Sequence, residues 1–307
     1  MADSSAPTIP VVCGPTAAGK TRIALWLAER TDVTIVSADS RQLYRGFDIG
    51  TAKPTTAERE MVPHHGVDEL DPMQRASAAW WADHADGWIR DARAQRRVPL
   101  VVGGTGLYLR ALFGTLFEEP PLDASRRAAL QHELSPYPTE TLRRWTRELD
   151  PPRATLGRTQ LLRALEIALL VGRRVSDLHR ERQRPARWKA RYLVVDPGPG
   201  LAARIEARVG VMMAHGWREE VRGLIGRVPA DAPAWNATGY RTIRLLEYGE
   251  LAERDAVQRV IVDTRQYAKR QRTWFRHQLA GDDVTRLDPC DPDWEARALF
   301  WWQTWHD

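Results

Sequence analysis

The chain carries the stretch Gly14-Pro15-Thr16-Ala17-Ala18-Gly19-Lys20-Thr21 between an apolar run at 9–13 and a helical pattern at 23–28. This is a complete G-x-x-x-x-G-K-T motif, in the strand-loop-helix context that a phosphate-binding loop requires. Backbone N–H groups of such a loop and the N-terminus of the next helix form an anion site. The alternative is a glycine-rich turn that only joins strand to helix. The motif predicts a bound di- or triphosphate, with Lys20 at the outer phosphates and Thr21 ligating Mg²⁺, and leaves the identity of that ligand open.

The composition is that of a basic globular protein. Among 307 residues there are 45 Lys and Arg against 40 Asp and Glu, giving a formal net charge of +5. A basic surface suits a polyanionic partner, although arginine richness also follows from genome composition. The two cysteines exclude a disulfide framework or a cysteine zinc site and fit a reducing cytosol. Because no signal-peptide pattern and no apolar run of membrane-spanning length is apparent, we expect a cytoplasmic protein without membrane contact.

Short apolar runs alternate with helical patterns along most of the chain, at 9–13, 33–37, 66–70, 98–102 and 191–195. This alternation predicts an α/β fold, a P-loop NTPase-like parallel sheet flanked by helices. Between 116 and 189 the pattern is helical and broken by prolines, which predicts an α-helical insertion domain. The core would then comprise 1–115 and 190–307. Four tryptophans near the C-terminus are expected to pack onto that core: Trp294, Trp301, Trp302 and Trp305.

The run at 33–36 delivers Ser37-Ala38-Asp39-Ser40 to the carboxyl edge of the sheet, where ligands of such folds bind. Asp39 is thereby placed to act as a base or to hold a metal through water. A helix N-cap is the alternative role for Asp and Ser. The glycine-punctuated loop 46–54, which contains Lys53, suits the lining of an anionic site.

The strand at 98–102 ends in Gly103-Gly104-Thr105-Gly106 and not in an acid. Many nucleotide hydrolases place a carboxylate there to hold Mg²⁺. Two glycines let backbone approach a ligand, and Thr105 offers a neutral hydroxyl. The pattern favours transfer chemistry at a diphosphate over a motor-type NTPase, while a small-molecule kinase remains possible.

A helix is predicted over 257–279, with one basic stripe formed by Arg265, Lys269, Arg272 and Arg276 at spacings of four, three and four. Its other face is apolar and suits the core. Such a helix fits contact with a phosphate backbone, and a plain amphipathic surface helix is the alternative.

Three motifs occur in a telling order: GPTAAGKT (14–21), SADSRQLYRGFDIGTAKP (37–54) and VVGGTGLYL (101–109). They are followed by LLRALEI (161–167), TGYRTI (238–243) and TRQYAKRQRTWFR (264–276). Together they resemble the tRNA dimethylallyltransferase family, also called tRNA isopentenyltransferases, from about residue 10 to 280.

The resemblance implies transfer of a dimethylallyl group from dimethylallyl diphosphate to N6 of adenine 37 in the tRNA anticodon loop. The phosphate loop would hold the donor's diphosphate, so nucleotide hydrolysis is not part of the reaction. Asp39 matches the family's general base. A base is needed because an exocyclic amine on a purine is a poor nucleophile and must lose a proton. Mg²⁺ at Thr21, with Lys20 and the loop N–H groups, would neutralise the leaving diphosphate, and Thr105 would hydrogen-bond it. Completion of the anion clamp is left open among Arg204, Arg208 and Arg222.

The family's tRNA-contacting segments map onto Asp39, Ser40, Arg41, Gln42, Leu43 and Tyr44, and onto Thr159, Gln160, Leu161, Leu162, Arg163 and Ala164. Thr105 and Arg127 are further candidates, and Arg265, Lys269 and Arg272 of the basic stripe complete the set. One departure is Gly157-Arg158-Thr159, where the family usually carries an Asn-Asp pair, and this leaves the insertion's detailed contacts open. We expect a monomer. Prenyl transfer to a free adenine nucleotide and a P-loop small-molecule kinase are the alternative activities, and a non-catalytic RNA-binding protein is a third reading.

Overall fold

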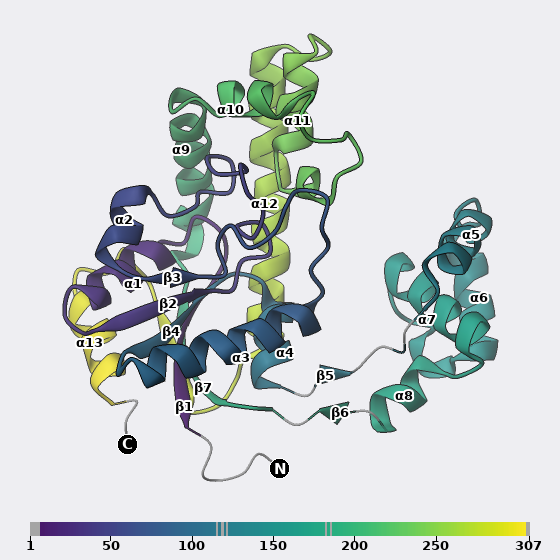
Figure 1. Cartoon of the computed structure of the whole chain (residues 1–307), viewed down its shortest axis with the longest axis horizontal. Coiled ribbons are helices and arrows are strands. Elements are labelled where there is room, and N and C mark those ends of the chain that lie inside the picture. Colours follow the sequence, from purple (N-terminus) through teal and green to yellow (C-terminus); the bar gives the residue numbers. More distant parts are fainter. Residues whose placement is uncertain are drawn as a thin grey trace. The chain divides into compact units, whose positions relative to one another are not determined.

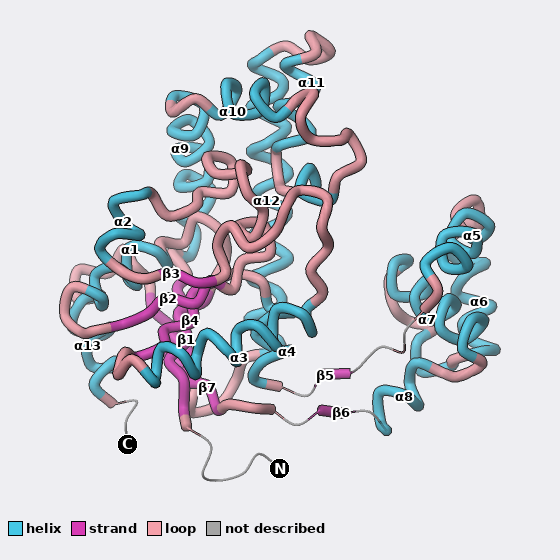
Figure 2. The backbone as a smooth tube through the Cα atoms, viewed as in Figure 1, coloured by secondary structure: helices cyan, strands magenta, loops and turns pink. Residues whose placement is uncertain are grey.

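The computed structural model describes residues 7–114, 116–117, 120, 122–181, 183–184 and 186–304. It divides into two compact units, Met1–Gly114 with Ala186–Asp307, and Thr115–Pro185. Figures 1 and 2 show a mixed α/β first unit and a helical second unit.

A six-stranded sheet forms the centre of the first unit, and all its pairings are parallel. The strand order is β3-β2-β4-β1-β7-β8. The strands are β1 (Thr8–Cys13), β2 (Val33–Ser37), β3 (His64–His65), β4 (Val98–Gly103), β7 (Lys189–Val195) and β8 (Val284–Leu287). The predicted parallel sheet flanked by helices is therefore confirmed.

Two details of the sheet differ from the sequence-based expectation. The strand predicted at 66–70 does not form: β3 ends before it, at His65, because Gly66 adopts a positive φ of 76° and turns the chain. Leu70 then makes only an isolated bridge to Tyr44. β8 was not predicted, because its four residues, Val-Thr-Arg-Leu, are too few and do not alternate in polarity.

Helices cover both faces of this sheet (Figure 1). α1 (Lys20–Ala28) and α13 (Trp294–Gln303) share one apolar core with Val12, Leu100 and Leu193 of the strands. α3 (Ala78–Ala94) and α4 (Gly106–Phe113) pack together, and α3 contacts β2 and β4. The remaining helices are α2 (Thr56–Met61), α9 (Leu201–Ala214), α10 (Trp217–Leu224), α11 (Tyr240–Glu247) and α12 (Glu253–Gln278), with short 3-10 turns at Gly198–Gly200 and Pro233–Asn236.

The second unit contains α5 (Ala124–Leu134), α6 (Thr139–Leu149), α7 (Arg158–Val171), α8 (Val175–Glu181) and a 3-10 turn at Pro151–Arg153. Near the two ends of this unit in the chain, β5 (Leu116–Phe117) and β6 (Gln183–Arg184) form an antiparallel pair. The insertion predicted at 116–189 differs at its C-terminal boundary. Trp188 is buried in the first unit, where its indole donates to Asp86, and Lys189 begins β7 beside Thr8.

The predicted packing of the C-terminal tryptophans is confirmed for the three that the structure describes. Trp294, Trp301 and Trp302 are buried in the core under α1. Trp305 lies outside the described residues.

We therefore expect Trp301→Ala to lower the free energy of unfolding by about 3–5 kcal/mol, because it empties a large volume in a packed core. The neighbouring Phe300 is 69 % exposed and provides a matched control. Phe300→Ala should change stability by less than about 0.5 kcal/mol. Denaturant unfolding of both variants measures the difference, and equal losses would contradict the assigned packing.

Candidate active site

The residues from Gly14 to Thr21 form one loop that joins β1 to α1. Its tight path depends on glycine at both ends. Gly14 has a φ of 148°, and a Cβ there would meet the carbonyl oxygen of Val195 at 2.1 Å. Gly19 has a φ of 99° at the helix N-terminus. Because N–H groups in the first helical turn lack intrahelical acceptors, the loop presents donors to an anion.

Lys20 is folded back onto this loop. Its ammonium donates to the carbonyl oxygen of Pro15 at 2.8 Å. Burial lowers the pKa of Lys20 to about 8, while the carboxylate of Asp39 acts in the opposite direction. A half-buried ammonium that donates to a carbonyl oxygen gains from an incoming anion, as expected for a phosphate ligand.

A cavity of about 530 Å³ opens beside the loop. It is lined by Lys20 and Thr21 from α1, by Asp39 after β2, and by Arg204 and Arg208 from α9. Asp39 is oriented locally, since one carboxylate oxygen accepts the backbone N–H of Arg41 at 2.9 Å. The structure thus brings the predicted base, lysine and metal-binding hydroxyl to one cavity.

A second, smaller pocket adjoins the first and shares Thr16, Asp39 and Arg208 with it. Its remaining wall is largely apolar and includes Ile205, Val209, Met212, Trp217 and Val260. Trp217 is held by close contact with two glycines, since a Cβ at Gly50 or Gly239 would meet its ring at 2.2 or 2.3 Å. A charged cavity therefore continues into a hydrophobic one past Asp39.

The three candidate clamp arginines have different surroundings. Arg222 lies on the far part of α10 and forms ion pairs with Glu247 and Glu219. Arg204 donates to the carbonyl oxygen of Ala17 at 3.0 Å and so supports the loop. Arg208 makes no hydrogen bond or ion pair with any residue that the structure describes, although burial lowers its pKa. The Arg208 side chain is half-buried, lines the phosphate cavity and interacts electrostatically with Asp39, so it is available to bind an anion there.

Thr105 is placed differently from the expectation. Its hydroxyl oxygen accepts the backbone N–H of Ser40 at 3.0 Å, and it does not line the phosphate cavity. Tyr267 of α12 forms a side-chain hydrogen bond with Thr105 and lines the apolar pocket together with Asp39. In this arrangement Thr105 holds the chain beside Asp39, and no leaving-group contact is visible for it.

Several residues predicted to contact tRNA are turned inward. Leu43 is fully buried and Tyr44 is nearly so. Gln42 donates to the carbonyl oxygen of Ala52 and accepts from the Ser37 hydroxyl. These side chains stabilise loop 37–54, whereas Ser40 and Arg41 of the same segment are partly exposed.

The same distinction applies within the second unit. Leu161 and Ala164 are buried in its core, so their side chains cannot reach RNA. Thr159 and Gln160 are exposed in the first turn of α7, and Leu162 is half-buried. Arg127 and Arg163 both bind the buried carboxylate of Glu166, at 3.0 and 2.8 Å.

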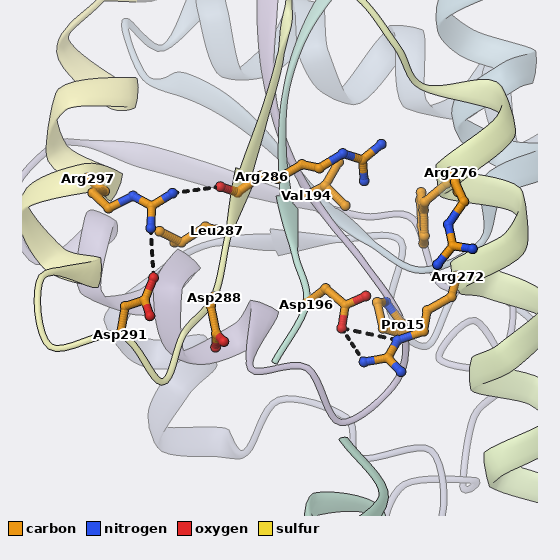
Figure 3. A pocket seen from close by; sticks show the side chains of 11 residues that line it. Pro15, Val194, Asp196, Arg272, Arg276, Arg286, Leu287, Asp288, Asp291 and Arg297 are labelled. Carbon is orange, nitrogen blue, oxygen red and sulfur yellow. Dashed lines mark hydrogen bonds and ion pairs between the residues drawn. The ribbon is translucent and has the colours of Figure 1, made fainter. Parts of the chain in front are cut away.

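The predicted basic stripe of α12 is only partly available. Lys269 and Arg276 are exposed. Arg265 pairs with Glu206, and Arg272 is committed to Asp196 and to the carbonyl oxygen of Gly198. Figure 3 shows the Arg272–Asp196 pair in a cavity behind Pro15, where Arg297 is likewise paired with Asp291. Arg272 therefore acts as a structural cross-link in this structure and not as a free cation.

Two residues have roles that the sequence did not indicate: Lys53, which was expected to line an anionic site, and Gln271. The Lys53 ammonium is buried and binds Asp48 at 2.6 Å, Asp68 at 2.5 Å and the Tyr44 carbonyl. Burial alone would raise the pKa of Asp68, but hydrogen bonds from Lys53 and Arg59 outweigh it and lower that pKa. Gln271 of α12 forms hydrogen bonds with the backbone of Thr16 and of Gly104. In the sequence, the only sign of Lys53 and Gln271 is that they lie in the motifs at 37–54 and 264–276.

Metal ligation would have to use few protein groups. Among the described residues there is no cluster of three or more His, Cys, Asp or Glu side chains that could hold a metal ion. Within that same part of the chain, no helix is both long and apolar enough to cross a membrane.

The sheet order, the loop between β1 and α1 and the adjoining cavity define a P-loop-like α/β protein. A family model described as IPP transferase matches residues 42–278, and one described as isopentenyl transferase matches residues 7–64. A tRNA dimethylallyltransferase of Anaeromyxobacter sp. (strain Fw109-5) is 44 % identical over 94 % of this chain and 97 % of its own length. One from Deinococcus radiodurans is 39 % identical over 94 % and 95 %.

Solved structures agree with these sequence relatives. The full-length tRNA isopentenylpyrophosphate transferase of Bacillus halodurans has a TM-score of 0.68 and 31 % identity, over 95 % of this chain and 93 % of that one. A eukaryotic dimethylallyltransferase acting on tRNA has a TM-score of 0.79 and 25 % identity, over 95 % and 78 %. The chain therefore belongs to the IPP transferase family of tRNA dimethylallyltransferases, and the alternative activities are not favoured.

The buried Lys53 network yields a test of how loop 46–54 is held. Lys53→Met should lower the free energy of unfolding by about 1–3 kcal/mol, because it removes the donor to the Tyr44 carbonyl and the cation of Asp48, while Asp68 keeps its ion pair with Arg59. The exposed Lys269 supplies the control, and Lys269→Met should cost less than about 0.5 kcal/mol. Denaturant unfolding at neutral pH compares the two, and an unaffected Lys53→Met variant would show that the network contributes no stability.

Proposed function

We propose that this protein transfers the dimethylallyl group of dimethylallyl diphosphate to N6 of adenine 37 in the anticodon loop of tRNA and releases diphosphate. The observation that carries the proposal is the continuity of two cavities at Asp39. One is lined by the cationic groups of the phosphate loop and α9, and the other is largely apolar beyond the residues that the two cavities share. A donor with a charged head and a hydrocarbon tail requires both. The names of the chain's relatives indicate that the transferred group is dimethylallyl and that the acceptor is tRNA.

In this proposal the diphosphate occupies the cavity beside the phosphate loop. Lys20 exchanges its bond to the Pro15 carbonyl for a phosphate oxygen, and Arg208 gains the anion that it lacks. Arg204 supports the loop through Ala17 and does not have to touch the ligand. These contacts favour Arg208 over Arg204 and Arg222 as the arginine that joins Lys20 in the clamp.

The transfer itself forms one bond and breaks one bond. The adenine N6 bonds to C1 of the allyl group as the C1–O bond to diphosphate breaks. The proton lost from N6 passes to the carboxylate of Asp39, which is accessible from both cavities. Lys20, Arg208 and the loop N–H groups stabilise the negative charge that develops on the departing diphosphate.

Mg²⁺ fits this site as a cofactor, held by the Thr21 hydroxyl and by phosphate oxygens. Mg²⁺ commonly takes one or two protein ligands and keeps several waters, so the lack of a carboxylate cluster among the described residues does not oppose it. When bound, it would add positive charge at the leaving group.

Adenine 37 must leave its stack to reach Asp39, as targets of other base-modifying enzymes do. We assign direct RNA contact to the partly exposed Ser40 and Arg41 and to exposed Lys269, with Thr159 and Gln160 in the helical unit. We further expect the enzyme to act in the cytoplasm as a monomer.

Mass spectrometry of tRNA tests the function directly. Unmodified tRNA incubated with enzyme, dimethylallyl diphosphate and Mg²⁺, without ATP, should gain one dimethylallyl group at position 37. Adenosine monophosphate in place of tRNA should remain unmodified. Strict ATP dependence, phosphorylation of an acceptor or prenylation of the free nucleotide would overturn the proposal.

Asp39→Ala should still bind tRNA but lower kcat by about 10²–10⁴-fold, since it removes the group that accepts the N6 proton. Asp39→Asn preserves the shape of the side chain and should behave alike. Filter binding and single-turnover kinetics separate the two effects. If Asp39→Asn retained full turnover, Asp39 would not be the base.

Arg208→Ala should raise the KM for dimethylallyl diphosphate by about 10–100-fold, the effect of losing one charge-assisted bond. The KM for tRNA should change little. Arg222→Ala, which removes an arginine already paired with acids, should match the wild type. Equal effects of the two variants would exclude Arg208 from the clamp.

A further inference from the structure

One side of α12 faces the loops at the carboxyl edge of the sheet. Tyr267, Gln271 and Trp274 follow at spacings of four and three residues, so they lie on one face of the helix. Tyr267 lines the apolar pocket beside Asp39. Trp274 occupies the space that a Cβ at Gly106 would need, 2.3 Å from its ring. Between them, Gln271 is buried and only 7 % exposed.

Gln271 connects two of these loops through its amide group. Its oxygen accepts the backbone N–H of Thr16, in the phosphate loop, at 2.8 Å. Its nitrogen donates to the backbone oxygen of Gly104, in the loop after β4, at 2.8 Å. A Cβ at Gly104 would meet that nitrogen at 2.4 Å, so glycine is required for this approach. The amide therefore acts both as acceptor and as donor, and its two partners determine the positions of Oε1 and Nε2.

The adjacent residue extends the same cross-link. Arg272 holds Asp196 and the Gly198 carbonyl, in the loop that follows β7. Two consecutive residues of one helix therefore bind the loops after β1, β4 and β7. Of these bonds, only that of Gln271 reaches the phosphate loop itself.

We propose that Gln271 is a positioning residue that fixes the phosphate loop in its anion-binding conformation before the donor arrives. Thr16 N–H is committed to Gln271 and Ala18 N–H donates to the carbonyl oxygen of Pro15 at 3.3 Å, while the N–H groups of Gly19 and Lys20 at the start of α1 remain for the ligand. A loop that is already ordered pays less conformational entropy on binding, so its affinity for diphosphate is higher. The inference rests on the proposed role of this loop as the donor site.

The test compares Gln271→Met, which keeps length but neither bond, with Gln266→Met on the same helix, where the glutamine is exposed. Gln271→Met should weaken the binding of inorganic diphosphate with Mg²⁺ by about tenfold, as expected for lost bonds to buried backbone groups. It should raise the KM for donor similarly and leave the KM for tRNA within about twofold, the noise of such measurements. Gln266→Met should match the wild type.

Hydrogen exchange in the ligand-free protein supplies a readout that does not depend on activity. Amides of the peptide covering residues 14–18 should exchange faster in Gln271→Met and in the shorter Gln271→Asn, while those of β7 stay protected. Unchanged exchange with unchanged diphosphate affinity would overturn the inference, and so would a uniform loss of protection in both variants. Failure of the prenyl-transfer proposal would instead appear as absent product with the diphosphate and exchange results intact.

Discussion

The close approach of backbone to backbone at the carboxyl edge of the sheet is the constraint on which this site depends. Gly14 leaves β1 against the carbonyl of Val195 at the end of β7, with no room for a side chain between them. Gly66 is similarly confined by Ser37, where a Cβ would lie 2.7 Å from the carbonyl oxygen. Parallel strands in the order β4-β1-β7 bring their loops to one edge, and these contacts set how near the loops can come. Asp39, Lys20 and Arg208 share a cavity because of that packing.

Much of this arrangement could be predicted from the sequence, because it follows from local patterns. The spacing of Gly14, Gly19, Lys20 and Thr21 predicts the phosphate loop, and the alternation of apolar runs with helical patterns predicts the parallel sheet. The position of Asp39 at the end of β2 then follows from topology alone. Short elements such as β3 and β8 were not predictable in the same way, because a few residues carry too little periodicity to be distinguished from a loop.

Side-chain partners were the part that the sequence could not provide. The basic stripe of α12 was placed correctly on one helix face, but Arg272 and Arg265 proved to be paired with Asp196 and Glu206, acids distant in the chain. Arg208, Arg204 and Arg222 looked equivalent as helix charges, and only burial and pairing distinguish them. Leu161 and Ala164 belong to a motif shared with the family, yet they lie in a core. A motif records which residues occur together and does not separate those that touch a ligand from those that hold the fold.

The same packing explains how a phosphate loop can serve transfer instead of nucleotide hydrolysis. Nucleotide hydrolases with a phosphate loop commonly carry a carboxylate at the end of a neighbouring core strand, where it holds Mg²⁺. In this chain that strand is β4 and it ends at Gly103, where a Cβ would lie 2.2 Å from the carbonyl oxygen of Ala38. The next residue, Gly104, is closed off by Gln271. A carboxylate at Gly103 would require movement of the backbone that carries Asp39, and one at Gly104 would displace the Gln271 side chain. The space that a hydrolase gives to a metal-binding acid is filled here by the chain that carries Asp39.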